Sequence, residues 1–259
     1  IIGGTDFSIE VLGIRTDKID RFFFPDSGIP CAVRAGDYIF TSAVEPDEAG
    51  DLDTESMSGL NKMICAVELA GGRKEDLVKN FVLLTDCSAF DAFNETYAKV
   101  FSVHSDPPAR TLHGVRQTLT GRRMAVEGIA YTGSDKAFIF AGKQNGSLPF
   151  CHASKAGDLV FISGQTGIIG ADGNYLLEFG AQVDRMIELV EAIYATGNFP
   201  ARRFQKNSVF VSYIPGLPDL EKHYRKIYDG QDSLATVYEV TSLAYEPLLI
   251  EMDSVIVTA

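Results

Sequence analysis

The stretches "AGDYIFTS" (residues 35–42) and "AGDLVFIS" (residues 156–163) repeat one pattern in a chain of 259 residues. In each stretch, a Gly-Asp pair that favours a turn is followed by β-branched and aromatic residues, which is typical of a buried strand. A pattern that recurs at long range indicates an internal repeat, and a repeat decides the whole architecture.

Other landmarks recur in the same order and at nearly the same offset, as tandem copies require. The matched pairs are "VKN" at 78–80 with "QKN" at 205–207, Tyr97 with Tyr224, Arg110 with Thr236, and Glu127 with Asp253. We therefore predict two copies of one unit, copy one over residues 1–133 and copy two over residues 134–259. Each copy is close to the usual size of a domain.

Hydrophobic periodicity predicts the order β-α-β-α-β-β in each copy. In copy one we expect strands at 35–44, 78–86, 111–117 and 123–131 and helices at 53–72 and 89–101, the first helix capped by Asp53 or Thr54. In copy two we expect strands at 159–163, 208–213, 236–241 and 248–257 and helices at 175–196 and 218–228.

This order predicts an α/β fold of the two-layer α+β sandwich type, in which a mixed sheet carries both helices on one face. The other face of each sheet lacks helices, and its apolar residues need a cover. Another copy of the unit could supply that cover, so we expect a homo-oligomer, with a trimer favoured.

Composition narrows the range of partners. A net charge of −12 repels phosphate backbones, which argues against a nucleic-acid partner. No apolar run is long enough to cross a membrane, so we expect a cytoplasmic protein with no membrane partner. The four cysteines and four histidines show neither C-x-x-C nor H-x-x-x-H spacing, so we expect no metal site, no disulfide framework and no cofactor.

Several motifs in this order resemble the Rid (YjgF-type) reactive-intermediate deaminases, a family also described as endoribonuclease L-PSP. The motifs are "FTSA" or "FISGQ", "VKNFVLLTD", "FDAFNETYAKVF", "PPAR" and a final strand with acidic residues. The resemblance implies intersubunit clefts that hydrolyse enamines and imines to 2-keto acids and ammonia. Family members are usually single-domain homotrimers, so a fused pair of copies is a departure.

The resemblance assigns Arg110 of "PPAR" to the substrate carboxylate, and a planar guanidinium fork suits that task. On its own, Arg110 would be read as an ordinary surface arginine. Copy two has Thr236 at the matching position. The family's water-activating Glu falls on Ala125 in copy one and on Glu251 in copy two, so each copy keeps one half of the pair. Glu127 is a further catalytic candidate on the same side of its strand as Ala125.

Substrate-binding candidates follow from the same resemblance. They are Asn94, Ala43, Phe150 and Gly164. We expect one composite cleft in which Arg110 and Asn94 of copy one face Phe150 and Gly164 of copy two. His113 and His152 lie nearby in the sequence, but we interpret them first as packed or exposed histidines.

Three functions stay open at this point. The first is a hydrolase or deaminase that converts a small carboxylate-bearing enamine or imine to a 2-keto acid and ammonia. The second is a non-catalytic protein that binds small carboxylates or acts as a scaffold. The third is a chorismatase-like enzyme, because chorismatases also carry two Rid-like domains, although this chain is short for one.

Overall fold

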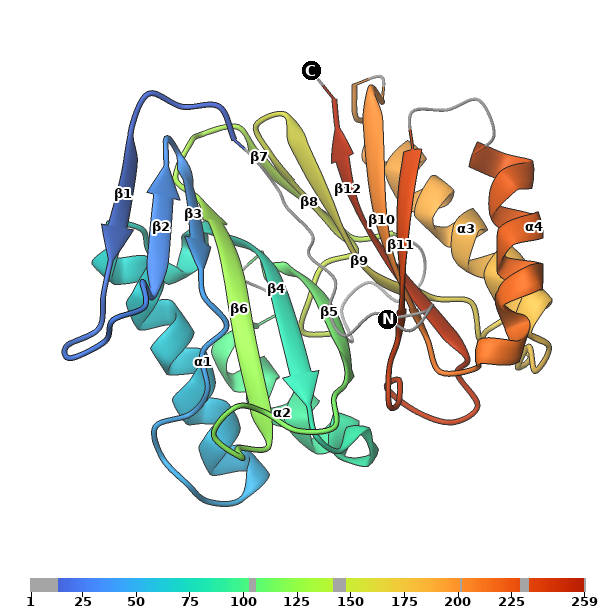
Figure 1. The fold of residues 1–259 in the computed structure, drawn as a ribbon. Helices are drawn as coiled ribbons and strands as arrows, with labels where there is room; N and C mark the ends of the chain where they lie inside the picture. Colours follow the sequence, from blue (N-terminus) through green and yellow to red (C-terminus); the bar gives the residue numbers. More distant parts are fainter. Residues whose placement is uncertain (1–13, 103–105, 142–147, 201, 229–232, 259) are drawn as a thin grey trace.

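A computed structural model describes residues 14–102, 106–141, 148–200, 202–228 and 233–258. Within these residues each half of the chain forms one six-stranded mixed sheet with two α-helices (Figure 1). The predicted fold class is therefore confirmed, and it occurs twice.

The first sheet has the strand order β1-β2-β3-β6-β4-β5, in which only β4 and β5 run parallel. Its elements are β1 (Ile19–Phe22), β2 (Ala32–Ala35), β3 (Tyr38–Thr41), α1 (Leu52–Leu69), β4 (Leu77–Leu84), α2 (Phe90–Val100), β5 (Ala109–Gly114) and β6 (Met124–Tyr131).

The second sheet has the order β11-β10-β12-β9-β8-β7, which is the same topology with β10 and β11 as the parallel pair. Its elements are β7 (Lys136–Ile139), β8 (Ala153–Ala156), β9 (Leu159–Thr166), α3 (Phe179–Thr196), β10 (Phe204–Val211), α4 (Leu217–Tyr228), β11 (Ser233–Glu239) and β12 (Ile250–Val257).

The structure corrects three local expectations. Each sheet gains short strands beyond the four predicted, because β1, β2 and β8 have four residues each, too few to show a hydrophobic period. The apolar run "AFIFAG" at 137–142 predicts a strand, and β7 lies there. Asp51 caps α1, because its carboxylate accepts from the Thr54 amide. Helix α3 begins at Phe179 rather than near Tyr175, because Tyr175 forms a β-bridge with Ile169.

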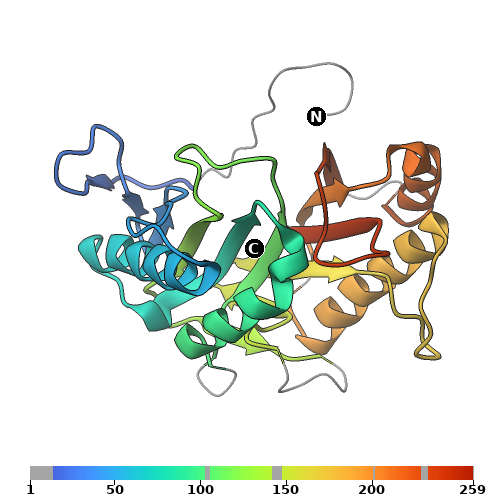
Figure 2. The same cartoon turned by 90° about the horizontal axis from the view of Figure 1, so that it is seen from below.

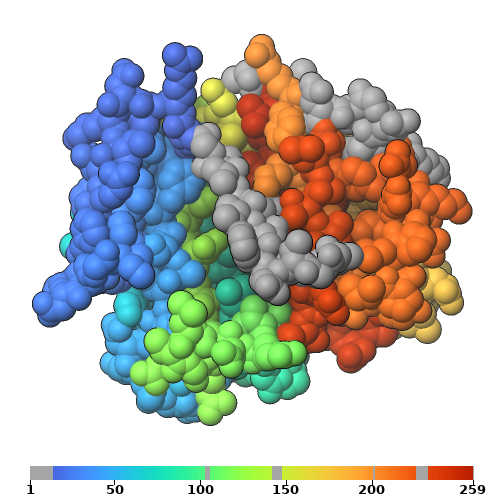
Figure 3. All heavy atoms as spheres, viewed as in Figure 1, coloured from blue at the N-terminus to red at the C-terminus, as the bar shows by residue number. Residues whose placement is uncertain are grey.

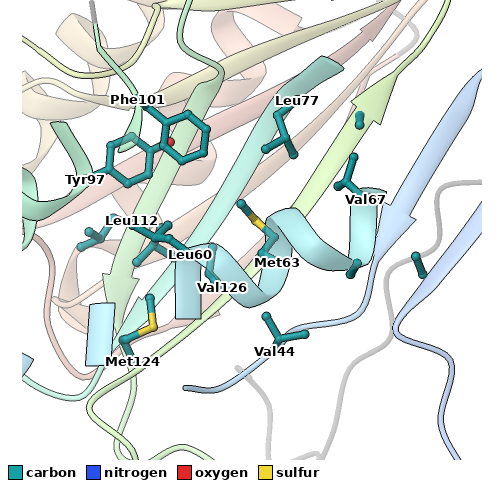
Figure 4. Packing of buried hydrophobic residues seen from close by; sticks show 14 of the residues in the cluster. Val44, Leu60, Met63, Val67, Leu77, Tyr97, Phe101, Leu112, Met124 and Val126 are labelled. Carbon is teal, nitrogen blue, oxygen red and sulfur yellow. The ribbon is translucent and has the colours of Figure 1, made fainter. Parts of the chain in front are cut away.

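Helix α1 covers one face of the first sheet with a fully buried stripe that includes Leu60, Met63 and Val67 (Figure 4). The helix ends before Gly71, whose φ of 80° is a left-handed conformation that glycine adopts without strain. Helices α3 and α4 cover the corresponding face of the second sheet, away from the first (Figures 1 and 2).

One buried hydrogen bond marks the repeat. The Asn80 side-chain amide donates to the Tyr97 hydroxyl at 2.8 Å, and Asn207 donates to the Tyr224 hydroxyl at 2.7 Å. Both pairs join the strand beside the parallel edge strand, β4 or β10, to the second helix of its copy. The same contact at matching positions supports the register of the repeat.

The two copies lie side by side (Figure 3), and they contact each other along β5 and β9. Ala109 forms a parallel bridge with Cys151, and the Arg110 amide donates to the Ser163 hydroxyl at 2.9 Å. An apolar cluster that includes Val78, Ala109, Cys151 and Phe161 fills the seam. Each copy therefore covers part of the helix-free face of the other.

Candidate functional site between the two copies

Arg110 is the second residue of β5, at the seam between the copies, and its side chain is only 3% exposed. The guanidinium carbon lies 4.3 Å from the centroid of the Phe150 ring and 4.7 Å from that of Tyr97. The rings of Phe90 and Phe93 lie at 5.6 and 5.7 Å. Three of these aromatic residues come from α2 of copy one, while Phe150 comes from copy two.

The aromatic rings surround the charged guanidinium of Arg110 but leave one of its nitrogens without a hydrogen-bond acceptor. Nη1 of Arg110 is buried without a hydrogen-bond partner. Burial lowers the pKa of Arg110 to about 10, so the group is still a cation at neutral pH. Because an unpaired buried donor is costly, the arrangement favours a ligand with oxygen acceptors.

Glu251 lies on β12 of copy two, between β9 and β10, and is 4% exposed. Burial and the nearby carboxylate of Asp253 raise its pKa to about 8, while Lys79, Arg110 and the main chain of Leu112 act in the opposite direction. At neutral pH its carboxyl therefore keeps its proton. Its Oε2 is buried without a hydrogen-bond partner, as Nη1 of Arg110 is.

Arg110 and Glu251 influence each other's pKa, yet within the described chain no ion pair joins them. Gly164 of β9 makes room for Glu251, since a Cβ atom at Gly164 would lie 1.7 Å from Oε1 of Glu251. Asn94 follows Phe93 on α2, and its Oδ1 is a third buried polar atom without a partner. A buried guanidinium and a protonated carboxyl thus share one seam.

The structure separates Ala43 and Glu127 from this group. Both line a different cleft of about 760 Å³ between the helix-free faces of the two sheets, together with His113 and Asp253. Burial and Asp253 raise the pKa of Glu127. The predicted roles of Ala43 and Glu127 at the Arg110 site therefore stay predictions.

The two histidines behave as packed side chains. The ring of His113 stacks on Phe210 with centroids 4.3 Å apart, and Nδ1 of His152 accepts from the Ala141 amide. Burial lowers the pKa of both imidazoles, which favours their neutral form. In the described part of the chain no group of three or more metal-ligating side chains occurs, and no helix has the length and apolar character of a membrane span.

Sequence reasoning missed one set of residues at the seam. Lys79 of β4 is 1% exposed and lies 3.3 Å from Asp253 of β12, with Thr111 between them. The sequence did contain a signal for this ion pair. Lys79 lies inside an otherwise apolar strand and recurs as Lys206 in the repeat, and a buried lysine needs a partner.

Comparisons with known proteins agree with this architecture. The family model described as Endoribonuclease L-PSP matches residues 30–132. A RutC family protein of Saccharolobus solfataricus is 31% identical over 104 residues, which span 38% of this chain and 79% of that protein.

Solved structures extend the comparison. A chorismatase superposes on 89% of this chain and 78% of its own, with a TM-score of 0.66 at 17% identity, which shows a shared fold. The YjgF gene product of E. coli is 26% identical, with a TM-score of 0.40, over 42% of this chain and 91% of its own. The chain belongs to the endoribonuclease L-PSP family, the Rid or YjgF type to which RutC proteins also belong.

Proposed function

We propose that this protein is a hydrolytic deaminase for a small enamine or imine that carries a carboxylate, and that it releases a 2-keto acid and ammonia. The proposal rests on two buried groups at the seam between the copies. Arg110 has a nitrogen without a hydrogen-bond partner, and Glu251 is protonated at neutral pH. Arg110 binds the carboxylate through charge-assisted hydrogen bonds, with the ring of Phe150 beside it.

The chemistry follows from the proton on Glu251. An enamine such as 2-aminoacrylate takes this proton on its terminal carbon and becomes an iminium ion, whose positive charge is partly offset by the carboxylate that Glu251 has become. Glu251 then accepts a proton from water as the water adds to the iminium carbon. The carbinolamine loses ammonia and leaves a 2-keto acid, so that one water is consumed for each ammonia released.

A second candidate is hydrolysis of an enolpyruvyl ether, as the name of the chorismatase neighbour suggests. The overlap with that neighbour extends over both copies of the unit. An enolpyruvyl ether contains the same CH2=C–COO⁻ fragment as 2-aminoacrylate, with an ether oxygen in place of nitrogen. Arg110 and Glu251 would act on it in the same two steps.

Freshly generated 2-aminoacrylate tests the first candidate, with ammonia release compared to the spontaneous rate in buffer. Chorismate, with pyruvate as the product measured, tests the second. We expect ammonia release above the spontaneous rate with the wild-type protein and a much smaller acceleration with Glu251→Gln. Wild-type protein that accelerates neither reaction but still binds 2-keto acids would leave only the non-catalytic carboxylate-binding function.

A further inference from the structure

The seam between the copies contains an ion pair that the proposed chemistry does not use. Lys79 of copy one and Asp253 of copy two are 1% and 2% exposed, and Nζ of Lys79 lies 3.3 Å from Oδ2 of Asp253. A lysine and an aspartate are rarely buried so completely unless they are paired. Each copy therefore contributes one charged group to this buried ion pair.

The hydrogen bonds around Lys79 fix the position of the pair. Nζ donates to Oγ1 of Thr111 at 2.7 Å and to the carbonyl oxygen of Ile162 in β9 at 2.9 Å. The Thr111 hydroxyl donates to Oδ2 of Asp253 at 2.9 Å. Three acceptors around Nζ suit an ammonium group, which has three donors. The network ties β4 and β5 of copy one to β9 and β12 of copy two.

Asp253 and Glu251 are two positions apart on β12, so their side chains lie on the same face of the strand. Asp253 raises the pKa of Glu251 and Lys79 lowers it. Among the described residues, the other ionisable groups that interact with Glu251 are Arg110 of β5, Cys87 of the 3-10 helix Cys87–Ala89, and Tyr245 of the loop before β12. Lys79 and Asp253 are the members of this set that pair with each other across the copies.

We propose that Lys79 and Asp253 are positioning residues whose ion pair places β12 against copy one and controls when Glu251 gains or loses its proton. Copy one, which supplies Arg110, thereby also influences the protonation of Glu251 in copy two through Lys79. This inference rests on the proposed function for its purpose, but the titration of Glu251 can be measured without any substrate.

The test follows the C=O stretching band of the protonated Glu251 carboxyl by infrared spectroscopy as the pH is raised. Loss of the band in Glu251→Gln assigns it. In Asp253→Asn, Lys79 remains without its balancing charge, and we expect the pKa of Glu251 to fall by about one unit. In Lys79→Met, Asp253 loses its balancing charge, and we expect the pKa to rise.

The control is Lys136→Met, which removes another ion pair between the copies, 2.7 Å from Asp76, and should leave the Glu251 titration unchanged. An unchanged pKa in Asp253→Asn, or shifts of the same sign in both variants, would overturn the inference. If Lys79→Met does not fold, Asp253→Asn decides alone, since asparagine keeps the size of aspartate and an acceptor for Thr111. Inactivity toward every substrate would refute the proposed function and leave this titration result standing.

Discussion

Arg110 keeps a positive charge inside the protein with one nitrogen unpaired, held between aromatic rings from both copies. Aromatic faces stabilise a guanidinium without using its N–H donors. Nη1 has no hydrogen-bond partner among the described residues, and we propose that a small carboxylate binds the guanidinium there. The sequence alone identified Arg110 only through a family motif, because the rings come from residues distant along the chain.

The first prediction concerns the proposed binding of a carboxylate at Arg110. Arg110→Lys and Arg110→Ala should weaken binding of small 2-keto acids by roughly 10- to 100-fold, because hydrogen bonds to a charged group contribute about 1.5–3 kcal/mol. Titration calorimetry measures the affinity. Arg202→Lys is the matched control, since the guanidinium carbon of Arg202 also lies over an aromatic ring, 4.7 Å from the centroid of Tyr194 in copy two. Equal affinity in wild type and Arg110→Ala would refute the assignment.

The second prediction concerns the pH dependence of Glu251. Its pKa of about 8 means that the acid form is present below that pH and is lost above it. The rate of the first protonation step should therefore fall as the pH rises through about 8. Glu251→Gln should lower kcat by about 10²–10⁴-fold and remove this limb of the profile, with little change in carboxylate affinity. A limb that survives in Glu251→Gln belongs to another group.

The third prediction concerns the space that Glu251 occupies. Gly164→Ala would place a Cβ atom 1.7 Å from Oε1 of Glu251, so the carboxyl has to move. We expect kcat to fall while Arg110 still binds 2-keto acids. Gly28→Ala is the matched control, because its Cβ atom would have no neighbour within 4 Å. Full activity of Gly164→Ala would show that the position of Glu251 is not needed.

At the scale of elements, the long helices and central strands were predictable because their apolar residues recur at a clear period. The short strands β1, β2 and β8 were harder, since four residues carry almost no periodic signal. The cap of α1 shifted from Asp53 to Asp51 because the Asp53 carboxylate instead pairs with Lys99 of α2. The local sequence shows which residues could cap a helix, but not which of them is instead engaged in a tertiary contact.

The candidate site was predictable in part for a similar reason. A repeat with Arg in one copy and Glu in the other led to a composite cleft, and the structure places Arg110 and Glu251 at one seam. The same comparison grouped Ala43 and Glu127 with them. Those residues instead line the cleft of about 760 Å³, whose lining does not include Arg110 or Glu251.

The fourth prediction compares one contact in the two copies. Tyr97→Phe leaves the buried Asn80 amide without its acceptor, and such a group costs about 1–3 kcal/mol. Tyr224→Phe should cost less, because Asn207 keeps a second acceptor in Ser233 at 3.2 Å. Urea denaturation of both variants measures the two losses of unfolding free energy. A larger loss in Tyr224→Phe would contradict this account of the repeat.

At the scale of the whole molecule, two sheets facing each other leave a cleft of about 760 Å³ whose walls include Phe40, Phe81 and Phe210. Exposed apolar surface of this kind favours association. The fifth prediction is therefore that the chain forms a homo-oligomer, with a trimer expected. Light scattering at micromolar concentration checks it, and a mass near 28.2 kDa, that of one chain, would contradict it.

The central claim is that the two copies build one site, with Arg110 from copy one and Glu251 from copy two acting on the same ligand. A crystal of the full chain soaked in pyruvate tests this most directly. We expect the pyruvate carboxylate on the guanidinium of Arg110 and its C2 carbon facing the Glu251 carboxyl. Pyruvate bound instead in the cleft beside Ala43 and Glu127, with Arg110 still unpaired, would contradict it.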